Sequence, residues 1–438
     1  MSSELLPLIK VDNKTGIAKV VAKVRARPQD LSQVVKRAGA IVEAVRKEGD
    51  AALVRYSREL EGVKMTAGQI QVSKAEVEAA AQRVDPKLMD ALRFALKRIQ
   101  RTQGQLLTRI PFSYVSDGFV TKSVVRPLDS VGCYVPGGKA SYSSTVLMTA
   151  GVAKLAGVKR VVICSPAGAD GKISDAILGA AKLCNVDAVY KLGGAQAIAA
   201  MAYGTKAVPK VTKIVGPGGL YVSAAKKVVS ADVPIDFFAG PTEMVVVADG
   251  RADARFAAWD LIAQAEHGTD GICCLVTWDE KLARKVKAIA EEVSPRLERK
   301  ELVKETLRKG FAILCKDKET AVELVNALAP EHLELMVKSP GEMAEAIENV
   351  GLILTGEFAP GAASDYCIGT DHVLPTEGTA RQRAGLTALD FVKVNWVVEG
   401  TKQGLKGLLP SLKELALAEG LPNHFLSAQS RYRKIAGE

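Results

Sequence analysis

Between residues 118 and 250, short runs of β-branched residues alternate with alanine-rich segments of helical spacing. The runs predict strands at Lys122–Arg126, Val131–Val135, Val158–Cys164, Ala188–Lys191, Lys213–Val215 and Met244–Ala248. The segments between them predict helices that include Ser144–Leu155, Ile173–Leu183 and Ala195–Ala202. Strands that alternate with helices form parallel sheets with helices on both faces. The pattern therefore predicts an α/β fold.

The same alternation resumes after a long predicted helix, Asp253–Glu266. Further strands are expected at Ile272–Thr277, Ala312–Leu314 and Gly351–Leu354, with helices at Glu280–Glu292, Glu319–Leu328 and Gly341–Asn349. Upstream, Leu31–Val45 and Lys74–Gln103 have helical spacing, and Asp50 and Asp85-Pro86 mark helix boundaries. After about residue 383 we expect a helical tail with turns at Pro410 and Pro422. Two α/β units are therefore expected.

The composition limits the classes of protein to consider. A chain of 438 residues has the length of about three domains and can bury a large core without disulfides. Its net charge of +10 raises the possibility of a nucleic-acid partner. The basic residues are mixed with acidic ones, as in residues 291–304, and no basic run is interleaved with aromatic residues. A solvated basic surface is the better interpretation.

Membrane and secretory signals are absent from the sequence. Residues 1–14 lack a basic start followed by an apolar run, and no stretch of about 18 residues is continuously apolar. The seven cysteines are odd in number and form no CxxC motif. Reduced thiols and a cytoplasmic location are expected.

Three glycine turns follow predicted strands, at Pro136-Gly137-Gly138, Gly193-Gly194 and Gly216-Pro217-Gly218-Gly219. Glycine lets a backbone approach a ligand closely, and the amino end of a following helix attracts phosphate. No strand is followed by GxGxxG, the usual dinucleotide motif. The turns alone leave a nucleotide site and ordinary tight turns both open.

The four histidines of the chain all have acidic or amide neighbours; they are His267, His332, His372 and His424. Gln264 lies three residues before His267, so both project from one face of a last helical turn, where an amide oxygen and an imidazole can hold a divalent metal. Glu331 precedes His332, a pair suited to acid–base chemistry near neutral pH.

The other two histidines lie in less regular surroundings. Asp365 and His372 belong to a segment rich in Gly, Ser, Thr and Pro, and Glu419 and His424 to the predicted tail. Taken singly, these residues are typical of helix caps, surface pairs and turns. Taken together, they indicate a metal site with an associated acid–base pair.

Eight stretches of the sequence resemble the histidinol dehydrogenase family, with matching order and spacing over nearly the whole chain. They are Val131–Gly138, Gly193–Ala199, Val215–Gly218, Ala239–Pro241, Gln264–Gly268, Pro330–Leu333, Gly369–Thr376 and the tail from Glu419 to His424. The resemblance implies two incomplete Rossmann-like α/β/α domains, as in aldehyde dehydrogenases. A helical arm would cover residues 1–25, a first domain residues 26–129 with 243–382, and a second, NAD-binding domain residues 130–242. Residues 383–438 would form a helical tail that reaches the partner subunit.

The resemblance also implies a reaction: two-step oxidation of L-histidinol through L-histidinaldehyde to L-histidine, the end of histidine biosynthesis, with two NAD consumed. His332 would be the general base, and Glu331 would activate water for the aldehyde step. Zinc would be held by Gln264, His267 and Asp365 of one subunit and His424 of the other subunit of a homodimer. The substrate would contact these four ligands and His332, and also Thr242, His372 and Glu419; NAD would contact Tyr134, Gln196 and Gly219.

Three positions depart from the usual family pattern. Gly219 replaces an Asn that contacts NAD, Thr242 replaces a Ser, and Asp371 replaces an Asn and adds a carboxylate near the site. These changes leave open a related zinc and NAD dehydrogenase of another small alcohol, such as a sulfopropanediol. Cys133 and Cys184 lie in apolar runs without an activating base and are interpreted as core residues.

Overall fold

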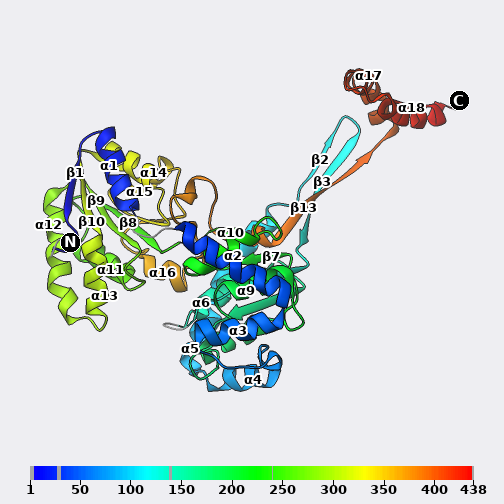
Figure 1. Cartoon of the computed structure of the whole chain (residues 1–438). Helices are drawn as coiled ribbons and strands as arrows, with labels where there is room; N and C mark the ends of the chain where they lie inside the picture. Colours follow the sequence, from blue (N-terminus) through cyan, green and yellow to red (C-terminus); the bar gives the residue numbers. More distant parts are fainter. Residues whose placement is uncertain (1–3, 27–30, 138–140, 239, 437–438) are drawn as a thin grey trace.

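The computed structural model describes residues 4–26, 31–137, 141–238 and 240–436. Gly138 of the first glycine turn and Ala239 of the matched AGP stretch lie outside these residues. Figure 1 shows two bodies side by side, each built around one sheet, and an arm that projects from them and ends in two helices. Both sheets carry helices, which confirms the predicted α/β class.

The first body is built on a six-stranded parallel sheet with strand order β1-β10-β9-β8-β11-β12. The strands are β1 (Leu8–Val11), β8 (Glu243–Ala248), β9 (Ile272–Thr277), β10 (Phe311–Cys315), β11 (His332–Met336) and β12 (Leu352–Thr355). All residues of β8, β9 and β11 are buried, as expected for central strands covered on both faces. The sequence does not predict β11, whose alternation of polar and apolar residues is brief, and His332 opens this strand rather than lying in a loop.

Helices cover both faces of this sheet. Residues at alternate positions of β8 pack against two separate helical layers, Val246 against one and Val245 and Val247 against the other. One layer consists of α11 (Ala254–Ala265), α12 (Glu280–Val293), η3 (Ser294–Arg296) and α13 (Lys300–Lys309); the other consists of α1 (Lys14–Arg25), α14 (Lys318–Leu328) and α15 (Pro340–Glu345). The expected arm of residues 1–25 is thus an edge strand and a covering helix of this body, because Val11, Ile17 and Val20 are buried in its core.

The second body has a four-stranded parallel sheet with order β6-β5-β4-β7. Its strands are β4 (Ser130–Tyr134), β5 (Arg160–Ser165), β6 (Ala188–Lys191) and β7 (Lys213–Val215). One face is covered by α2 (Leu31–Glu48), α3 (Asp50–Glu61), η1 (Ala67–Gln69), α9 (Gly194–Tyr203) and α10 (Leu220–Val229). The other is covered by α4 (Lys74–Arg83), α5 (Pro86–Thr108), α6 (Ser143–Val146), a π-helical turn (Leu147–Gly151), α7 (Val152–Leu155) and α8 (Asp175–Leu183).

This packing differs from the expected division, which places residues 26–129 in the first domain. The apolar faces of α2 and α5 share cores with the four-stranded sheet, for example Ile41 with Val162 and Leu96 with Ile163. Helical spacing shows which face of a helix is apolar but not which sheet it covers, so the sequence pattern could not make this assignment.

The projecting arm is a three-stranded antiparallel sheet, β13-β3-β2, followed by two helices. Its elements are β2 (Ser113–Ser116), β3 (Phe119–Pro127), β13 (Val392–Gly400), α17 (Lys402–Ala418) and α18 (Pro422–Ala436). The prediction of an entirely helical tail after residue 383 is therefore wrong at β13, and the predicted strand Lys122–Arg126 lies in this sheet rather than in a parallel one. Pairing of β3 with a segment about 270 residues away leaves no local signal.

Three short helices complete the described chain: α16 (Gly361–Tyr366), η4 (Thr379–Arg381) and η5 (Ala388–Phe391). All seven cysteines are free, and Cys133 and Cys184 are buried in the core as expected. Among the described residues, no helix has both the length and the apolar character needed to cross a membrane.

Candidate active site

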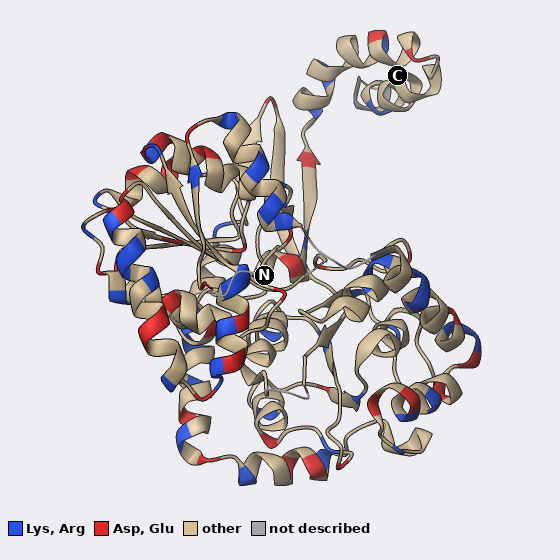
Figure 2. Ribbon diagram, turned by 60° about the vertical axis from the view of Figure 1, so that its left-hand side comes forward, with Lys and Arg blue, Asp and Glu red and all other residues tan. Residues whose placement is uncertain are grey.

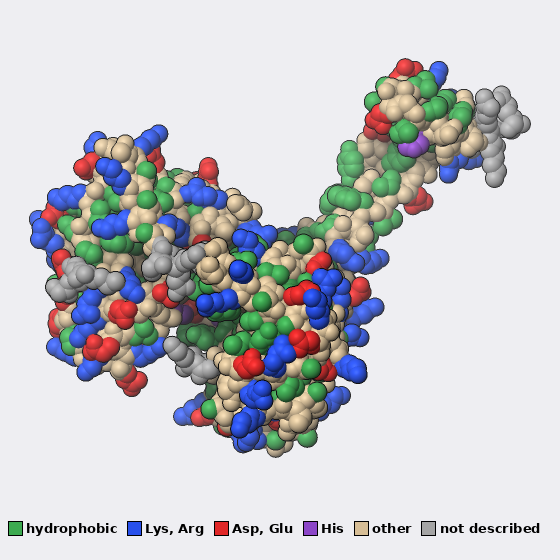
Figure 3. All heavy atoms as spheres, in the orientation of Figure 1, with side chains coloured by type: hydrophobic (Ala, Val, Ile, Leu, Met, Phe, Trp, Pro, Cys, Tyr) green, Lys and Arg blue, Asp and Glu red, His purple; other side chains and the backbone are tan. Residues whose placement is uncertain are grey.

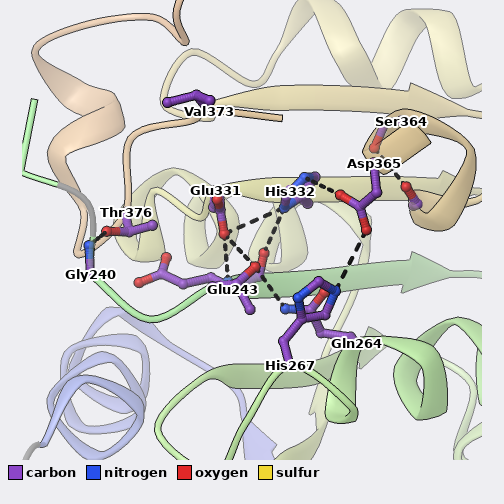
Figure 4. Close-up of polar contacts among 12 residues, drawn as sticks. Gly240, Glu243, Gln264, His267, Glu331, His332, Ser364, Asp365, Val373 and Thr376 are labelled. Carbon is purple, nitrogen blue, oxygen red and sulfur yellow. Dashed lines mark hydrogen bonds and ion pairs between the residues drawn. The ribbon is translucent and has the colours of Figure 1, made fainter. Parts of the chain in front are cut away.

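The four predicted residues Gln264, His267, His332 and Asp365 come together with Glu331 at the amino ends of β8 and β11 (Figure 4). The last turn of α11 carries Gln264, with His267 just beyond it, and the short helix α16 carries Asp365. These elements are distant in sequence, and only the fold of the first body brings them together.

Glu331 is fixed by hydrogen bonds to one of its carboxylate oxygens. Oε2 accepts from Thr242 Oγ1 and from the backbone N–H of Glu243, each at 2.7 Å. Gln264 Nε2 donates to Thr242 Oγ1 at 3.0 Å, so Thr242 connects the amide to the carboxylate. The methyl group that distinguishes Thr242 from Ser leaves this hydroxyl function intact.

His332 is held in one orientation by the same strand ends. Its Nδ1 lies 3.2 Å from the carbonyl oxygen of Glu243 and 3.5 Å from Glu331 Oε2. Because a carbonyl only accepts, Nδ1 of the neutral ring carries the proton and Nε2 keeps its lone pair. His332 Nε2 is buried, has no hydrogen-bond partner among the described residues, and lies 3.9 Å from Asp365 Oδ1. An unpartnered basic nitrogen thus faces the side chains of the proposed metal ligands.

The pKa of His332 reflects opposing effects. Burial lowers it, but the charge and hydrogen bond of Glu331 and the charge of Asp365 outweigh burial and raise the pKa to about 9. The imidazolium form is therefore stabilised by two neighbouring carboxylates, as suits a base that must hold a proton during a reaction.

Asp365 remains ionised despite its burial. Burial alone would raise the pKa of this carboxyl, but the nearby imidazole of His267 and the charges of His332 and His372 lower it. Asp365 Oδ2 lies 3.6 Å from His267 Nε2, which is too long for a hydrogen bond. Two ligands bound at about 2.05 Å to a tetrahedral zinc lie about 3.3 Å apart, so this spacing suits a shared ion.

Gln264 completes the set within the chain. Because its Nε2 donates to Thr242, Oε1 is the amide atom left to bind a metal. Within the described part of one chain, no three His, Cys, Asp or Glu side chains form a group that could hold a metal ion. The donor types of Gln264, His267 and Asp365 fit zinc, and the set is short of one strong ligand.

His424 and Glu419, the remaining predicted site residues of the tail, do not approach these side chains in the same chain. His424 lies in α18, at the far end of the projecting arm, and Glu419 at the end of α17 (Figure 1). The structure of one chain thus leaves both residues away from the site.

His372 is engaged on both ring nitrogens. Nδ1 lies 2.8 Å from the carbonyl oxygen of Asp365, and Nε2 lies 3.1 Å from Thr145 Oγ1. Its backbone N–H also contacts Met148 Sδ at 3.1 Å. Thr145 and Met148 flank the start of the π-helical turn of the second body, so His372 joins the two bodies beside the site.

Asp371 is buried beside His372. The residue is 5% exposed, Oδ1 accepts from the backbone N–H of Val373 at 2.8 Å, and Oδ2 has no hydrogen-bond partner in the described chain. Burial raises the pKa of Asp371 well above its ordinary value. Burial thus favours the neutral acid, which resembles the asparagine of the usual family pattern more closely than a carboxylate does.

The three residues expected to contact NAD lie at the carboxyl ends of the second sheet or just beyond them. Tyr134 ends β4, and its hydroxyl accepts from the N–H of Gly194 at 3.1 Å. Gln196 is buried in the first turn of α9, and Gly219 precedes α10. No side chain caps the amino end of α10, and a Cβ at Gly219 would meet nothing within 4 Å, so this end has free N–H groups and space for an anionic cofactor.

Two supporting residues escape prediction from the sequence. Glu243 is buried, its carboxylate pairs with Arg25 from the end of α1, and its backbone holds both Glu331 and His332. Arg25 also donates to the carbonyl oxygens of Leu328 and Ala329, at the end of α14 just before Glu331. In the sequence, the one indication of a supporting role is that Glu243 directly follows Thr242 and the matched AGP stretch.

Charged side chains of both signs lie on the surface. Basic and acidic side chains are interspersed over the helices of both bodies in the views of Figures 2 and 3.

Comparisons with known proteins agree with the geometry. Residues 24–432 match the family model described as histidinol dehydrogenase. The histidinol dehydrogenase of Methanothermobacter thermautotrophicus is 42% identical over 418 residues, covering 95% of this chain and 97% of that protein. That of a Synechococcus species is 42% identical, covering 90% and 91%. The crystal structure of histidinol dehydrogenase from Elizabethkingia anophelis superposes with a TM-score of 0.92 at 32% identity, covering 98% and 99%. On these matches over nearly its full length, the chain belongs to the histidinol dehydrogenase family.

Proposed function

We propose that this chain oxidises L-histidinol to L-histidine in two NAD-dependent steps, at a zinc site that two identical chains share. Histidinol dehydrogenases are NAD-dependent oxidoreductases, and the family match covers almost the whole chain. The observation that carries the proposal is the buried, unpartnered His332 Nε2, which faces Asp365 and lies beside Glu331. This arrangement has a base, a second carboxylate and metal-ligand side chains around one space.

Gln264, His267 and Asp365 would hold the ion, with His424 of the second chain as the fourth protein ligand. Zinc, when bound, supplies a Lewis acid that anchors the imidazole and amine of the substrate. Thr242, His372 and Glu419 are the further substrate contacts we propose. Fixing the non-reacting part of histidinol places its hydroxyl carbon near His332 and retains the aldehyde between steps.

In the first step, His332 Nε2 takes the proton of the substrate hydroxyl while the carbinol hydrogen leaves as hydride to NAD. The Glu243 carbonyl oxygen keeps the proton on Nδ1, and Glu331 and Asp365 stabilise the imidazolium that forms. In the second step, Glu331 would take a proton from water as the water oxygen adds to the aldehyde, and protonated His332 would return its proton to the aldehyde oxygen, which gives the hydrate and a neutral His332. His332 then accepts the hydroxyl proton of the hydrate as the second hydride leaves.

The NAD site we propose lies at Tyr134, Gln196 and Gly219. Because Gly219 lacks the family's usual amide, backbone N–H groups at the amino end of α10 are the donors that remain for the cofactor.

A homodimer with shared active sites would account for the projecting arm and for its exposed apolar side chains. The three ligands that we propose within one chain leave one position of a tetrahedral zinc for a fourth, and the arm and tail expose many apolar side chains (Figure 3). They include Tyr114, Val115, Trp396, Val397, Val398, Leu408, Leu415, Leu417, Leu421 and Leu426. Burial of such a surface by a second copy stabilises association. Free cysteines and the biosynthetic role of the family support a cytoplasmic location.

The main test is NADH release by the purified protein with histidinol. We expect two NADH per histidinol, loss of activity with a chelator, and recovery with zinc. Reduction of NAD with a sulfopropanediol but not with histidinol would overturn the substrate assignment in favour of a related alcohol dehydrogenase.

Sharing of the site between chains has its own test. His424→Ala and His267→Ala chains should each be inactive, but a mixed dimer keeps one site with all its ligands. Co-refolding equal amounts should restore about a quarter of wild-type activity, because about half of the dimers are mixed and each has one intact site of two. No recovery, with mixed dimers present by mass, would refute a shared site.

A further inference from the structure

The most deeply buried ion pair among the described residues of the second body joins Lys226, in α10, to Asp236. The side chain of Lys226 is 1% exposed and that of Asp236 is 0% exposed. Lys226 Nζ donates to Asp236 Oδ1 at 2.5 Å, to the Gly216 carbonyl oxygen at 2.7 Å and to the Phe237 carbonyl oxygen at 3.2 Å. All three ammonium protons therefore have acceptors within the protein.

Asp236 is satisfied equally fully. Oδ2 accepts from the backbone N–H of Gly216 at 2.7 Å, and Oδ1 accepts from the N–H of Phe237 at 2.7 Å as well as from Lys226. The two charged side chains thus bind both polar backbone groups of Gly216, its N–H and its carbonyl.

Gly216 is the first residue of the turn that leads to Gly219 and the amino end of α10. Its φ is +113°, and a Cβ there would lie 2.1 Å from the carbonyl oxygen of Tyr134. The turn is therefore pressed against the end of β4, in a backbone conformation that only glycine adopts readily. Such a conformation persists only where the surroundings determine it.

We propose that the Lys226–Asp236 ion pair is a positioning device that holds the Gly216–Gly219 turn, and with it the amino end of α10, in the shape that binds NAD. The proposal rests on the NAD site proposed above. The pair forms hydrogen bonds with the backbone of Gly216 in the turn. Its role is to position backbone N–H groups rather than to contact the cofactor.

Stability alone does not account for such a pair. Removing two charges from water is costly, and apolar side chains of similar size often stabilise a core as well or better. What apolar side chains cannot do is bind the N–H and carbonyl of one strained glycine at the same time. Because Gly219 has no side-chain amide, the backbone N–H groups of this turn are the donors that remain for the cofactor, and their position therefore matters more.

The test uses the zinc-loaded full-length protein and fluorescence titration with NADH. In Lys226→Met, we expect the Kd for NADH and the KM for NAD to rise tenfold or more. The KM for histidinol should change less than threefold, and the zinc content should be unchanged. Lys227→Met is the matched control, because Lys227 is the exposed neighbour on the same helix.

Lys226→Met leaves Asp236 buried without its counter-ion, so folding is checked by circular dichroism and by a second variant. Lys226→Met/Asp236→Leu removes both charges and is expected to fold while binding NADH as weakly as the single variant. Unchanged NADH affinity in the folded double variant would overturn the inference, as would equal rises of both KM values. Failure of the wild-type protein to bind NADH would instead overturn the NAD site itself, and the inference with it.

Discussion

Replacement of Glu331 by Gln is the most informative perturbation of the acid–base pair. An amide oxygen can accept both bonds that Glu331 Oε2 now accepts, from Thr242 Oγ1 and the N–H of Glu243 at 2.7 Å. The local structure should therefore survive while the negative charge is lost. Any change in the reaction then reports on the charge and on the loss of a carboxylate base.

The effect on His332 can be estimated from the structure. A carboxylate 3.5 Å from Nδ1 stabilises the imidazolium by about 5 kcal/mol at an effective dielectric constant near 20, and burial opposes this. The net result is a pKa of about 9 for His332, against an ordinary value of 6.5. Without Glu331, burial is opposed only by weaker contributions, so the pKa of His332 should fall by about 3.5, the equivalent of about 5 kcal/mol.

The assay is the pH dependence of the first hydride transfer, measured by stopped-flow NADH formation. A general base acts when unprotonated, so the wild-type rate should rise with pH and level off above about 9. In Glu331→Gln, the pH at which the rate levels off should fall by about 3.5 units. Oxidation of added histidinaldehyde should slow by about 10²- to 10⁴-fold, because the water has lost its base.

The matched control is Glu345→Gln, an exposed carboxylate at the end of α15, which should leave both measurements unchanged. If the rate of hydride transfer in Glu331→Gln still levels off near pH 9, the electrostatic coupling between Glu331 and His332 would be refuted. Equal slowing of the alcohol and aldehyde steps would refute the water-activating role.

Three further predictions concern single side chains. His332→Ala should lower turnover by about 10²- to 10⁴-fold with one zinc still bound per chain; wild-type turnover would rule out its role as base. Glu61→Gln should flatten the pH dependence of stability. Burial raises the pKa of Glu61 from 4.5 to about 7, so its stabilisation is complete below pH 4.5 and is lost as the pH rises through 7, by on the order of 3 kcal/mol. Urea unfolding at several pH values measures this, and identical curves for both proteins would contradict it. Asp371→Asn should keep full activity and at least wild-type stability, because burial raises the pKa of Asp371 well above its ordinary value and so favours the neutral acid, which an amide resembles; a lower melting temperature would show that its charge is needed.

Local patterns predicted most of the regular elements. The buried runs of β8 and β9 and the capped start of α5 at Asp85-Pro86 are readable because neighbouring residues decide them. β13 was missed for the opposite reason: its residues are largely exposed and become a strand only by pairing with β3. β11 was also missed; it is buried, and it becomes a strand by pairing with β8 and β12.

For the site, residue chemistry indicated which side chains to consider but not their arrangement. The rarity of histidine and the family motifs singled out His267 and His332, and the structure places both beside Asp365. The tautomer of His332 depends on a carbonyl oxygen, and the raised pKa of Asp371 depends on burial, and no motif records either. The supporting contacts of Arg25 join positions more than 200 residues apart.

The sequence by itself determined the α/β class, the family and the chemical types of the reacting groups, since these depend on periodicity and on residue identity at short spacing. Only the tertiary structure decided which sheet each helix covers, which nitrogen of His332 has no hydrogen-bond partner, and that the helix carrying His424 lies at the end of the arm. These outcomes arise from packing and hydrogen bonding between distant segments, whose free energy exists only once the chain has folded.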